Sequence, residues 1–135
     1  MKVVFFYGLF MDEAMLKEQG LNPRNCQLAC LRGYGLRIGN KATLELSEHE
    51  ICYGTVMQLS NSELDQLYAS AGVVDYMPQS IQVTALSGEL IDAVTYILPM
   101  EMLSGHNSSY ALALVAVAQK LNMPEDYINE IATWC

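Results

Sequence analysis

The fold is decided by the stretch Val3-Val4-Phe5-Phe6-Tyr7-Gly8-Leu9-Phe10 near the start of the chain. Its consecutive β-branched and aromatic residues predict a strand that is buried on both faces. Gly8 interrupts the bulky run, and glycine is typical of positions where the backbone turns or approaches another group closely. We therefore expect a central strand that ends beside a site, although an ordinary core strand with a glycine turn would give the same pattern.

Composition limits the classes of protein and partner that fit this chain. With 135 residues, 52% hydrophobic and 16% charged, residues 1–135 are expected to form one compact domain. The formal net charge is −8 and the seven Lys and Arg residues form no basic run, which argues against nucleic acid as a partner. The longest apolar stretch is far shorter than the roughly 20 residues that cross a bilayer, so no membrane partner is expected either.

The four cysteines and the first residues of the chain indicate a reducing compartment. Cys26, Cys30, Cys52 and Cys135 are irregularly spaced, form no Cys-x-x-Cys pair and lie in apolar contexts. We expect them to be buried free thiols without a metal or redox role. The first residues lack the architecture of a signal peptide, which predicts a cytoplasmic location.

Predicted strands and helices follow one another along the rest of the chain. Strands are expected over residues 25–40, 51–59, 76–86 and 90–98, and helices over residues 12–19, 60–72, 110–121 and from Pro124 onward. Residues 41–50 are polar and acidic and are predicted to be an exposed loop or hairpin edge. Ser60 and Glu63 have the spacing of a capping box. The sum of about five or six short strands with one helix between them and two closing helices predicts an α+β fold, with a strongly curved mixed sheet or small barrel.

The helix predicted over residues 110–121 is apolar nearly all round. Such a helix is expected to be buried on most sides, either within the domain or against another chain. A homodimer is therefore one possible assembly.

Several motifs, in their order and spacing, resemble the gamma-glutamylcyclotransferase family. They are Phe6-Tyr7-Gly8, Asn22-Pro23, Ala29-Cys30-Leu31, Leu36-Arg37-Ile38-Gly39-Asn40, Tyr53-Gly54-Thr55-Val56, Gly72-Val73 with Tyr76, Ser108-Ser109-Tyr110 and Asn122-Met123-Pro124-Glu125. The likeness covers nearly the whole chain and implies a gamma-glutamylcyclotransferase-like fold. It also implies a chemistry that releases an amine from a γ-glutamyl amide by cyclising the glutamyl group to 5-oxoproline, without a cofactor, a metal or an enzyme nucleophile.

The sequence departs from the family at the residues that the resemblance implies are catalytic. The family's proton-transferring glutamate immediately precedes a Gly-Val, and this position holds Ala71 here. The family's Tyr-Gly-Ser-Asn is replaced by Tyr7-Gly8-Leu9-Phe10, which loses two hydrogen-bonding side chains. A general base contributes roughly 10²–10⁴ in rate, so the resemblance implies a poor cyclotransferase.

Two interpretations from different classes follow. In the first, the fold persists as a non-catalytic or weakly active module with a small-molecule pocket, made more apolar by Tyr68 and Met77 among others. Its ligand would be of the γ-glutamyl amine type or a more apolar relative. The residues expected at this pocket are Tyr7, Gly8, Leu9, Phe10, Ala71, Tyr76 and Tyr110.

In the second interpretation, the protein is an active cyclotransferase that draws its acid from elsewhere. Asp75 is the nearest candidate, and Glu89 and Glu101 are vaguer ones. Asp75 would equally suit a simple turn between a helix and a strand.

Overall fold

The run at the start of the chain forms strand β1 (Lys2–Phe6) in the computed structural model, which describes residues 1–69, 73 and 75–135. Val4, Phe5 and Phe6 follow one another and all three are buried, so both faces of the strand are covered as predicted. Strand β1 pairs antiparallel with β3 (Ala42–Leu59) and parallel with β5 (Leu90–Ile97). The first strand therefore lies inside the sheet, with a neighbour on each side.

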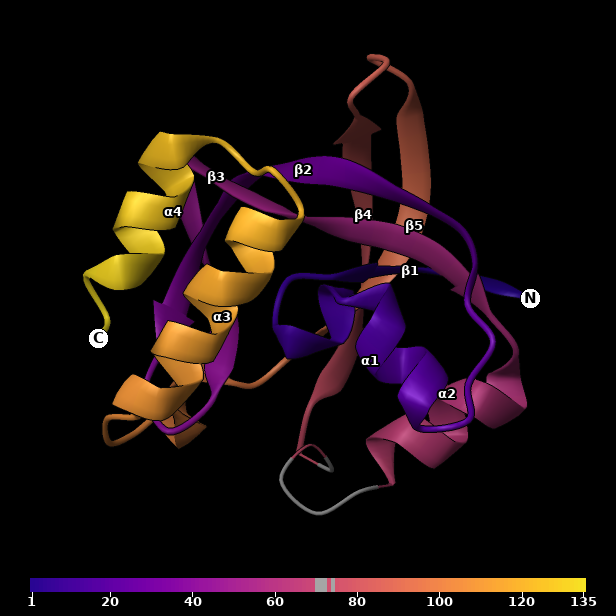
Figure 1. Ribbon diagram of the computed structural model, residues 1–135, viewed down its shortest axis with the longest axis horizontal. Helices are drawn as coiled ribbons and strands as arrows, with labels where there is room; N and C mark the ends of the chain where they lie inside the picture. The colour runs from indigo at the N-terminus through magenta and orange to yellow at the C-terminus, as the bar shows by residue number, and fades with distance from the viewer. Residues whose placement is uncertain (70–72, 74) are drawn as a thin grey trace.

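The sheet closes into a mixed barrel, which confirms the predicted fold class (Figure 1). The strand order is β1-β3-β2-β4-β5, where β2 is Arg24–Ile38 and β4 is Met77–Ala85. Strands β2 and β3 form a long antiparallel hairpin, and β4 and β5 form a second one. Gly33 has a φ of +86° and lies where the register of β2 shifts against β3, as is typical of a β-bulge.

Of the exposed loop or hairpin edge predicted over residues 41–50, the hairpin is present, because residues 42–50 open strand β3 and pair with β2, whereas the loop and the full exposure are wrong. Ala42, Thr43 and Leu44 are all buried, and Glu45 pairs with Gly35 of β2. The segment lies in the outer part of the β2–β3 hairpin, where the acidic side chains face solvent and mask the strand signal. The turn between the two strands, around Asn40 and Lys41, lies beside the site described below.

In the described part of the chain, four α-helices and two short 3₁₀ segments lie around the barrel. They are η1 (Leu9–Met11), α1 (Glu13–Glu18), α2 (Asn61–Tyr68), η2 (Met100–Met102), α3 (Ser108–Lys120) and α4 (Glu125–Ala132). The capping box predicted for α2 is confirmed: the Glu63 backbone N–H donates to Ser60 Oγ at 3.1 Å, and the Ser60 N–H donates to Glu63 Oε1 at 2.9 Å. Helix α2 ends at Tyr68, before the predicted stop at Gly72, which lies outside the described residues.

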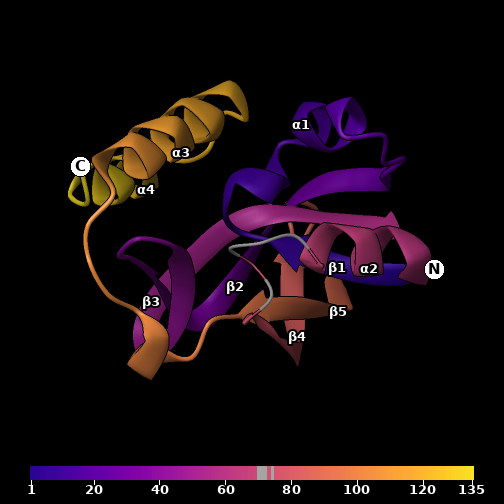
Figure 2. The same cartoon turned by 90° about the horizontal axis from the view of Figure 1, so that it is seen from below.

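Helices α3 and α4 lie side by side on one flank of the barrel (Figures 1 and 2). Ala111, Leu114 and Ala118 of α3 are buried, but Leu112 is 59% exposed. Burial of most sides within the domain is therefore wrong, because only one face of the helix packs on the protein, and burial of the other faces against another chain stays a prediction. The outer face is apolar in composition, and the homodimer expected from it stays a prediction.

The cysteines are all free, but their burial differs from the prediction. Cys52 is buried, Cys26 and Cys30 are half-buried, and Cys135 is exposed at the end of the chain. The expectation of burial was wrong for Cys135 because the last residues follow α4 onto the surface. Within the part of the chain that the structure describes, no helix has the length and apolarity needed to span a membrane.

Candidate functional site

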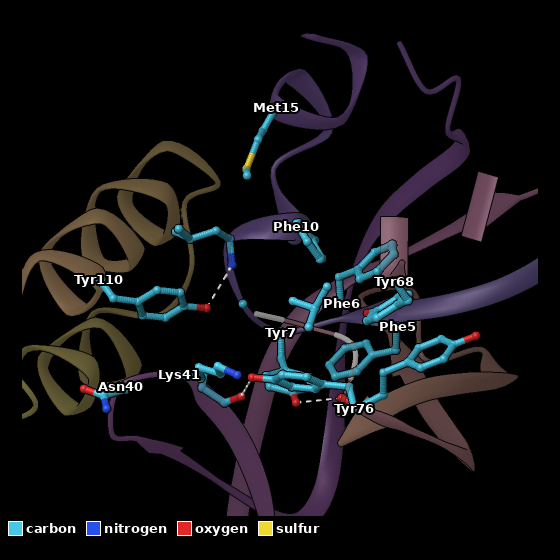
Figure 3. A pocket seen from close by; sticks show the side chains of 15 residues that line it. Phe5, Phe6, Tyr7, Phe10, Met15, Asn40, Lys41, Tyr68, Tyr76 and Tyr110 are labelled. Atoms are coloured by element: carbon cyan, nitrogen blue, oxygen red, sulfur yellow. Dashed lines mark hydrogen bonds between the residues drawn. The ribbon is translucent and has the colours of Figure 1, made fainter. Parts of the chain in front are cut away.

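A cavity of about 280 Å³ opens where β1 ends (Figure 3). All three phenylalanines of the chain and five of its eight tyrosines line it. The described lining residues are Phe5, Phe6, Tyr7, Gly8, Leu9, Phe10, Met15, Asn40, Lys41, Ala42, Tyr68, Val73, Tyr76, Tyr96 and Tyr110. Several elements of the fold converge at this cavity, because its lining residues come from β1, η1, α1, the β2–β3 turn, α2, β5 and α3.

Gly8 is required at this cavity by a close approach. Its φ of −101° and ψ of −154° are open to any residue, so backbone strain is not the reason for glycine. A Cβ at this position would lie 2.5 Å from Tyr110 Oη, which leaves no room for a side chain. The close approach predicted from the sequence at Gly8 is therefore present.

Tyr110 reaches the end of β1 from the first turn of α3. Its hydroxyl accepts a hydrogen bond from the Leu9 backbone N–H at 3.3 Å. Asn107 caps the helix by accepting from the Tyr110 N–H at 3.0 Å, and it also donates to the carbonyl of Asn40 at 3.2 Å. The start of α3 thus ties the β2–β3 turn to the helix that carries Tyr110.

Two other tyrosines use their hydroxyls to hold the wall of the cavity. Tyr7 donates to the carbonyl of Tyr96 at 2.7 Å, and Tyr76 donates to the carbonyl of Ala42. Tyr7 is only 5% exposed, so it forms part of the floor of the cavity. Burial raises the pKa of both phenols well above the ordinary value, which keeps them protonated donors at neutral pH.

One side of the cavity is built from aromatic rings. Phe10 meets Phe6 and Tyr68 edge to face, each at a centroid distance of 6.0 Å. Tyr68 stacks on Tyr96 with the centroids 4.0 Å apart. Such contacts add to the burial of the rings and fix their orientation, so this side is a preformed apolar surface.

The opposite side carries the polar groups, namely Asn40, Lys41 and Tyr110 (Figure 3). Lys41 is the only charged side chain among the described lining residues, and it forms no ion pair with any described residue. Burial raises the pKa of Tyr110 to about 12, although the Leu9 N–H counteracts part of this effect. The Tyr110 hydroxyl therefore keeps its proton at neutral pH and can donate it to a ligand.

The residues expected at a pocket are placed as follows. Tyr7, Gly8, Leu9, Phe10, Tyr76 and Tyr110 line the same cavity. Ala71 lies outside the described residues. That this cavity binds a ligand stays a prediction.

The alternative acids and one apolar candidate lie elsewhere. Asp75, Glu89 and Glu101 are exposed, and none is among the described lining residues. Met77 is 60% exposed at the start of β4 and also lies outside the lining, which corrects the expectation that it makes the pocket apolar.

Sequence reasoning missed much of the lining, including Met15, Asn40, Lys41 and Tyr96. The sequence predicts a strand end at Asn40 and a solvated segment from Lys41 onward, because acidic residues dominate the composition of residues 41–50. Tyr96 lies in a predicted strand, but nothing in the sequence showed which way its ring points.

Comparison with known proteins shows the family. Residues 51–131, more than half of the chain, match the AIG2-like family, and the chain belongs to it. Comparison with curated proteins finds no match.

The solved structures show the same fold at low sequence identity. A gamma-glutamyl cyclotransferase covers 99% of this chain and 88% of its own, with a TM-score of 0.78 and 19% identity. An uncharacterised protein from Homo sapiens covers the same shares, with a TM-score of 0.75 and 19% identity. A yeast gamma-glutamyl cyclotransferase specific to glutathione covers 98% of this chain and 94% of its own, with a TM-score of 0.66 and 11% identity. The resemblance to the gamma-glutamylcyclotransferase family is confirmed at the level of the fold.

The contact between Gly8 and Tyr110 gives the first testable prediction. Gly8→Ala should lower the free energy of unfolding by about 1–3 kcal/mol, because the new methyl group overpacks against the Tyr110 hydroxyl. In a Tyr110→Phe background the nearest remaining ring atom is 3.9 Å away, an ordinary contact, so the same substitution should cost at least about 1 kcal/mol less. Urea unfolding of the four proteins in this cycle measures the coupling.

Tyr34→Phe is the matched control, because Tyr34 is a half-buried tyrosine that does not line the cavity. Its effect should add to that of Gly8→Ala without coupling. Equal costs of Gly8→Ala with and without the Tyr110 hydroxyl would contradict the close approach.

Proposed function

We propose that this protein binds a small molecule in the aromatic pocket and is a degenerate, non-catalytic or weakly active member of the gamma-glutamylcyclotransferase-like fold. One observation carries the proposal: no Asp or Glu is among the described residues that line the cavity. The residues outside the described part are Ser70, Ala71, Gly72 and Val74, and none of these is acidic. Neither the described lining residues nor these four residues include a carboxylate.

A carboxylate matters because the cyclisation moves two protons. The substrate's α-ammonium must lose a proton before its nitrogen attacks the γ-carbonyl, and the leaving amine must gain one. The phenols of the pocket are poor substitutes for a base, since burial raises the pKa of Tyr7, Tyr68 and Tyr76 and brings that of Tyr110 to about 12. Their phenolate forms are scarce at neutral pH.

The turn after β1 supports the same proposal. A backbone N–H at a strand end is suited to stabilise a developing oxyanion when it is free to donate. Here the Leu9 N–H already donates to Tyr110 Oη, so a substrate oxygen would have to displace the hydroxyl. Leu9 and Phe10 further replace the two polar side chains that the resemblance implies at this turn.

The alternative is an active cyclotransferase that uses Asp75. Its carboxylate is exposed and lies outside the described lining of the cavity, so the geometry gives it no role in moving protons there. We therefore place the binding function first.

Activity measurements separate the two functions. We expect incubation with γ-glutamyl dipeptides or γ-glutamyl amines to release 5-oxoproline at least about 10²-fold more slowly than a typical enzyme turns over, because the general base is missing. Chromatography of long incubations measures the product. Turnover of about 1 s⁻¹ or faster would refute the proposal, and loss of that turnover in Asp75→Asn would establish the alternative.

Restoring the missing groups gives a further prediction. Ala71→Glu should produce weak cyclotransferase activity, because it returns the carboxylate that the resemblance implies at this position, and a carboxylate that loses water has a raised pKa and can act as a base. Adding Leu9→Ser and Phe10→Asn should increase the rate more than additively, since groups at one site act as a unit. Phe10 packs against Phe6 and Tyr68, so its replacement is expected to cost about 3 kcal/mol of stability.

Ala71→Gln is the matched control, because glutamine has about the size of glutamate and no titratable carboxylate. Circular dichroism and urea unfolding first identify the variants that fold. If neither Ala71→Glu nor a folded triple variant is faster than Ala71→Gln, Ala71 does not occupy the catalytic position and this part of the proposal is wrong.

A further inference from the structure

The two sides of the cavity differ in what they offer a ligand. The rings of Phe6, Phe10 and Tyr68 form one side, and Lys41 lies on the other side with the Tyr110 hydroxyl (Figure 3). A ligand that satisfies both sides has a flat apolar part and a single polar end.

The hydroxyls of Tyr7 and Tyr76 are already used within the protein. Both donate to backbone carbonyls, those of Tyr96 and Ala42. A polar substituent placed against either phenol would lose its water without gaining a donor from it, which costs binding free energy. A ring gains burial and edge-to-face or stacked contacts there instead.

The polar side favours an anion. Lys41 has no ion-pair partner among the described residues, and no carboxylate is among the described lining. Tyr110 Oη accepts from the Leu9 N–H, and no acceptor for its own proton is found in the described part of the chain. Accepting one hydrogen bond strengthens the next one that a hydroxyl donates, so Tyr110 is a prepared donor.

We propose that the pocket selects a small aromatic carboxylate. Its ring packs against Phe10 and Tyr68, and its carboxylate faces the Lys41 ammonium and the Tyr110 hydroxyl. This inference rests on the proposed function, since it names the ligand class of the same pocket. Both polar contacts involve a charged partner, which makes such hydrogen bonds stronger than neutral ones.

The same arrangement discriminates against a zwitterionic γ-glutamyl group. Its α-ammonium would enter a pocket whose one charged lining side chain in the described residues is also positive. Without a carboxylate to pair with, that ammonium is disfavoured by repulsion and by loss of water. The pocket is thus suited to an acid that carries no amino group.

The cavity volume limits the size of the ligand. A cavity of about 280 Å³ is at the lower end of the roughly 300–1,000 Å³ of ligand pockets, so it fits one ring with a short carboxylate-bearing chain.

Calorimetric titration with 3-phenylpropanoate at neutral pH tests the proposal. Three further compounds each test one feature of the ligand. The neutral 3-phenylpropanamide lacks the negative charge, hexanoate lacks the aromatic ring, and the γ-glutamyl amide of ethylamine carries an α-ammonium group. We expect 3-phenylpropanoate to bind at least tenfold more tightly than each of the other three. Equal affinity for the acid and its amide, or for the acid and hexanoate, would overturn the ligand class.

Two substitutions assign the polar contacts. Lys41→Met should weaken 3-phenylpropanoate at least tenfold and leave the affinity for 3-phenylpropanamide within twofold, because only the acid meets the ammonium. Tyr110→Phe should weaken the acid severalfold. The matched controls are Lys2→Met and Tyr34→Phe, which lie outside this cavity and should change nothing. An unchanged affinity of Lys41→Met for the acid would overturn the proposal.

The outcomes also separate this inference from the proposed function. If some of the four compounds bind but the acid is not preferred, the ligand class is wrong and the binding function stands. If none binds at millimolar concentration, or if the γ-glutamyl amide is turned over to 5-oxoproline at about 1 s⁻¹ or faster, both fail.

Discussion

The Tyr110 hydroxyl lies over the backbone of Gly8 and Leu9, and the shape of the site depends on this contact. It joins residues 101 positions apart in the chain, at the end of β1 and the start of α3. Because a Cβ at residue 8 would collide with the hydroxyl, the chain needs glycine at this point. The contact closes one side of the cavity and uses the backbone N–H that would otherwise be free to stabilise an oxyanion.

The rest of the cavity follows from where the barrel brings its aromatic residues. The end of β1 lies next to the last residue of α2 and to β5, so Phe6, Tyr68 and Tyr96 meet in one wall. The β2–β3 turn places Lys41 opposite this wall. A fold shared with gamma-glutamyl cyclotransferases thus surrounds a cavity whose described lining has a positive charge and no carboxylate, and the proposed binding function rests on this combination.

Much of the fold could be predicted because local signals agreed with tertiary structure. The apolar run of β1 and the capping box at Ser60 each have a local physical cause. The sequence does not assign the first half of β3 to a strand, because its acidic residues face solvent and mask the strand pattern, although it pairs with the adjoining end of β2. Tyr110 could be named as a site residue from the family resemblance, and Gly8 from the glycine that follows the apolar run. Lys41 and Tyr96 could not be named, because only the closed barrel sets the directions of their side chains.

Hydrogen exchange of the Leu9 amide is the most direct test of the contact on which the site depends. In the wild-type protein this amide donates to Tyr110 Oη, so removing the hydroxyl by Tyr110→Phe should speed its exchange roughly two- to tenfold, the worth of one hydrogen bond. Amides of the β2–β3 hairpin and the Tyr34→Phe protein serve as controls and should not change. Exchange of the Leu9 amide at the same rate with and without the Tyr110 hydroxyl would contradict the account.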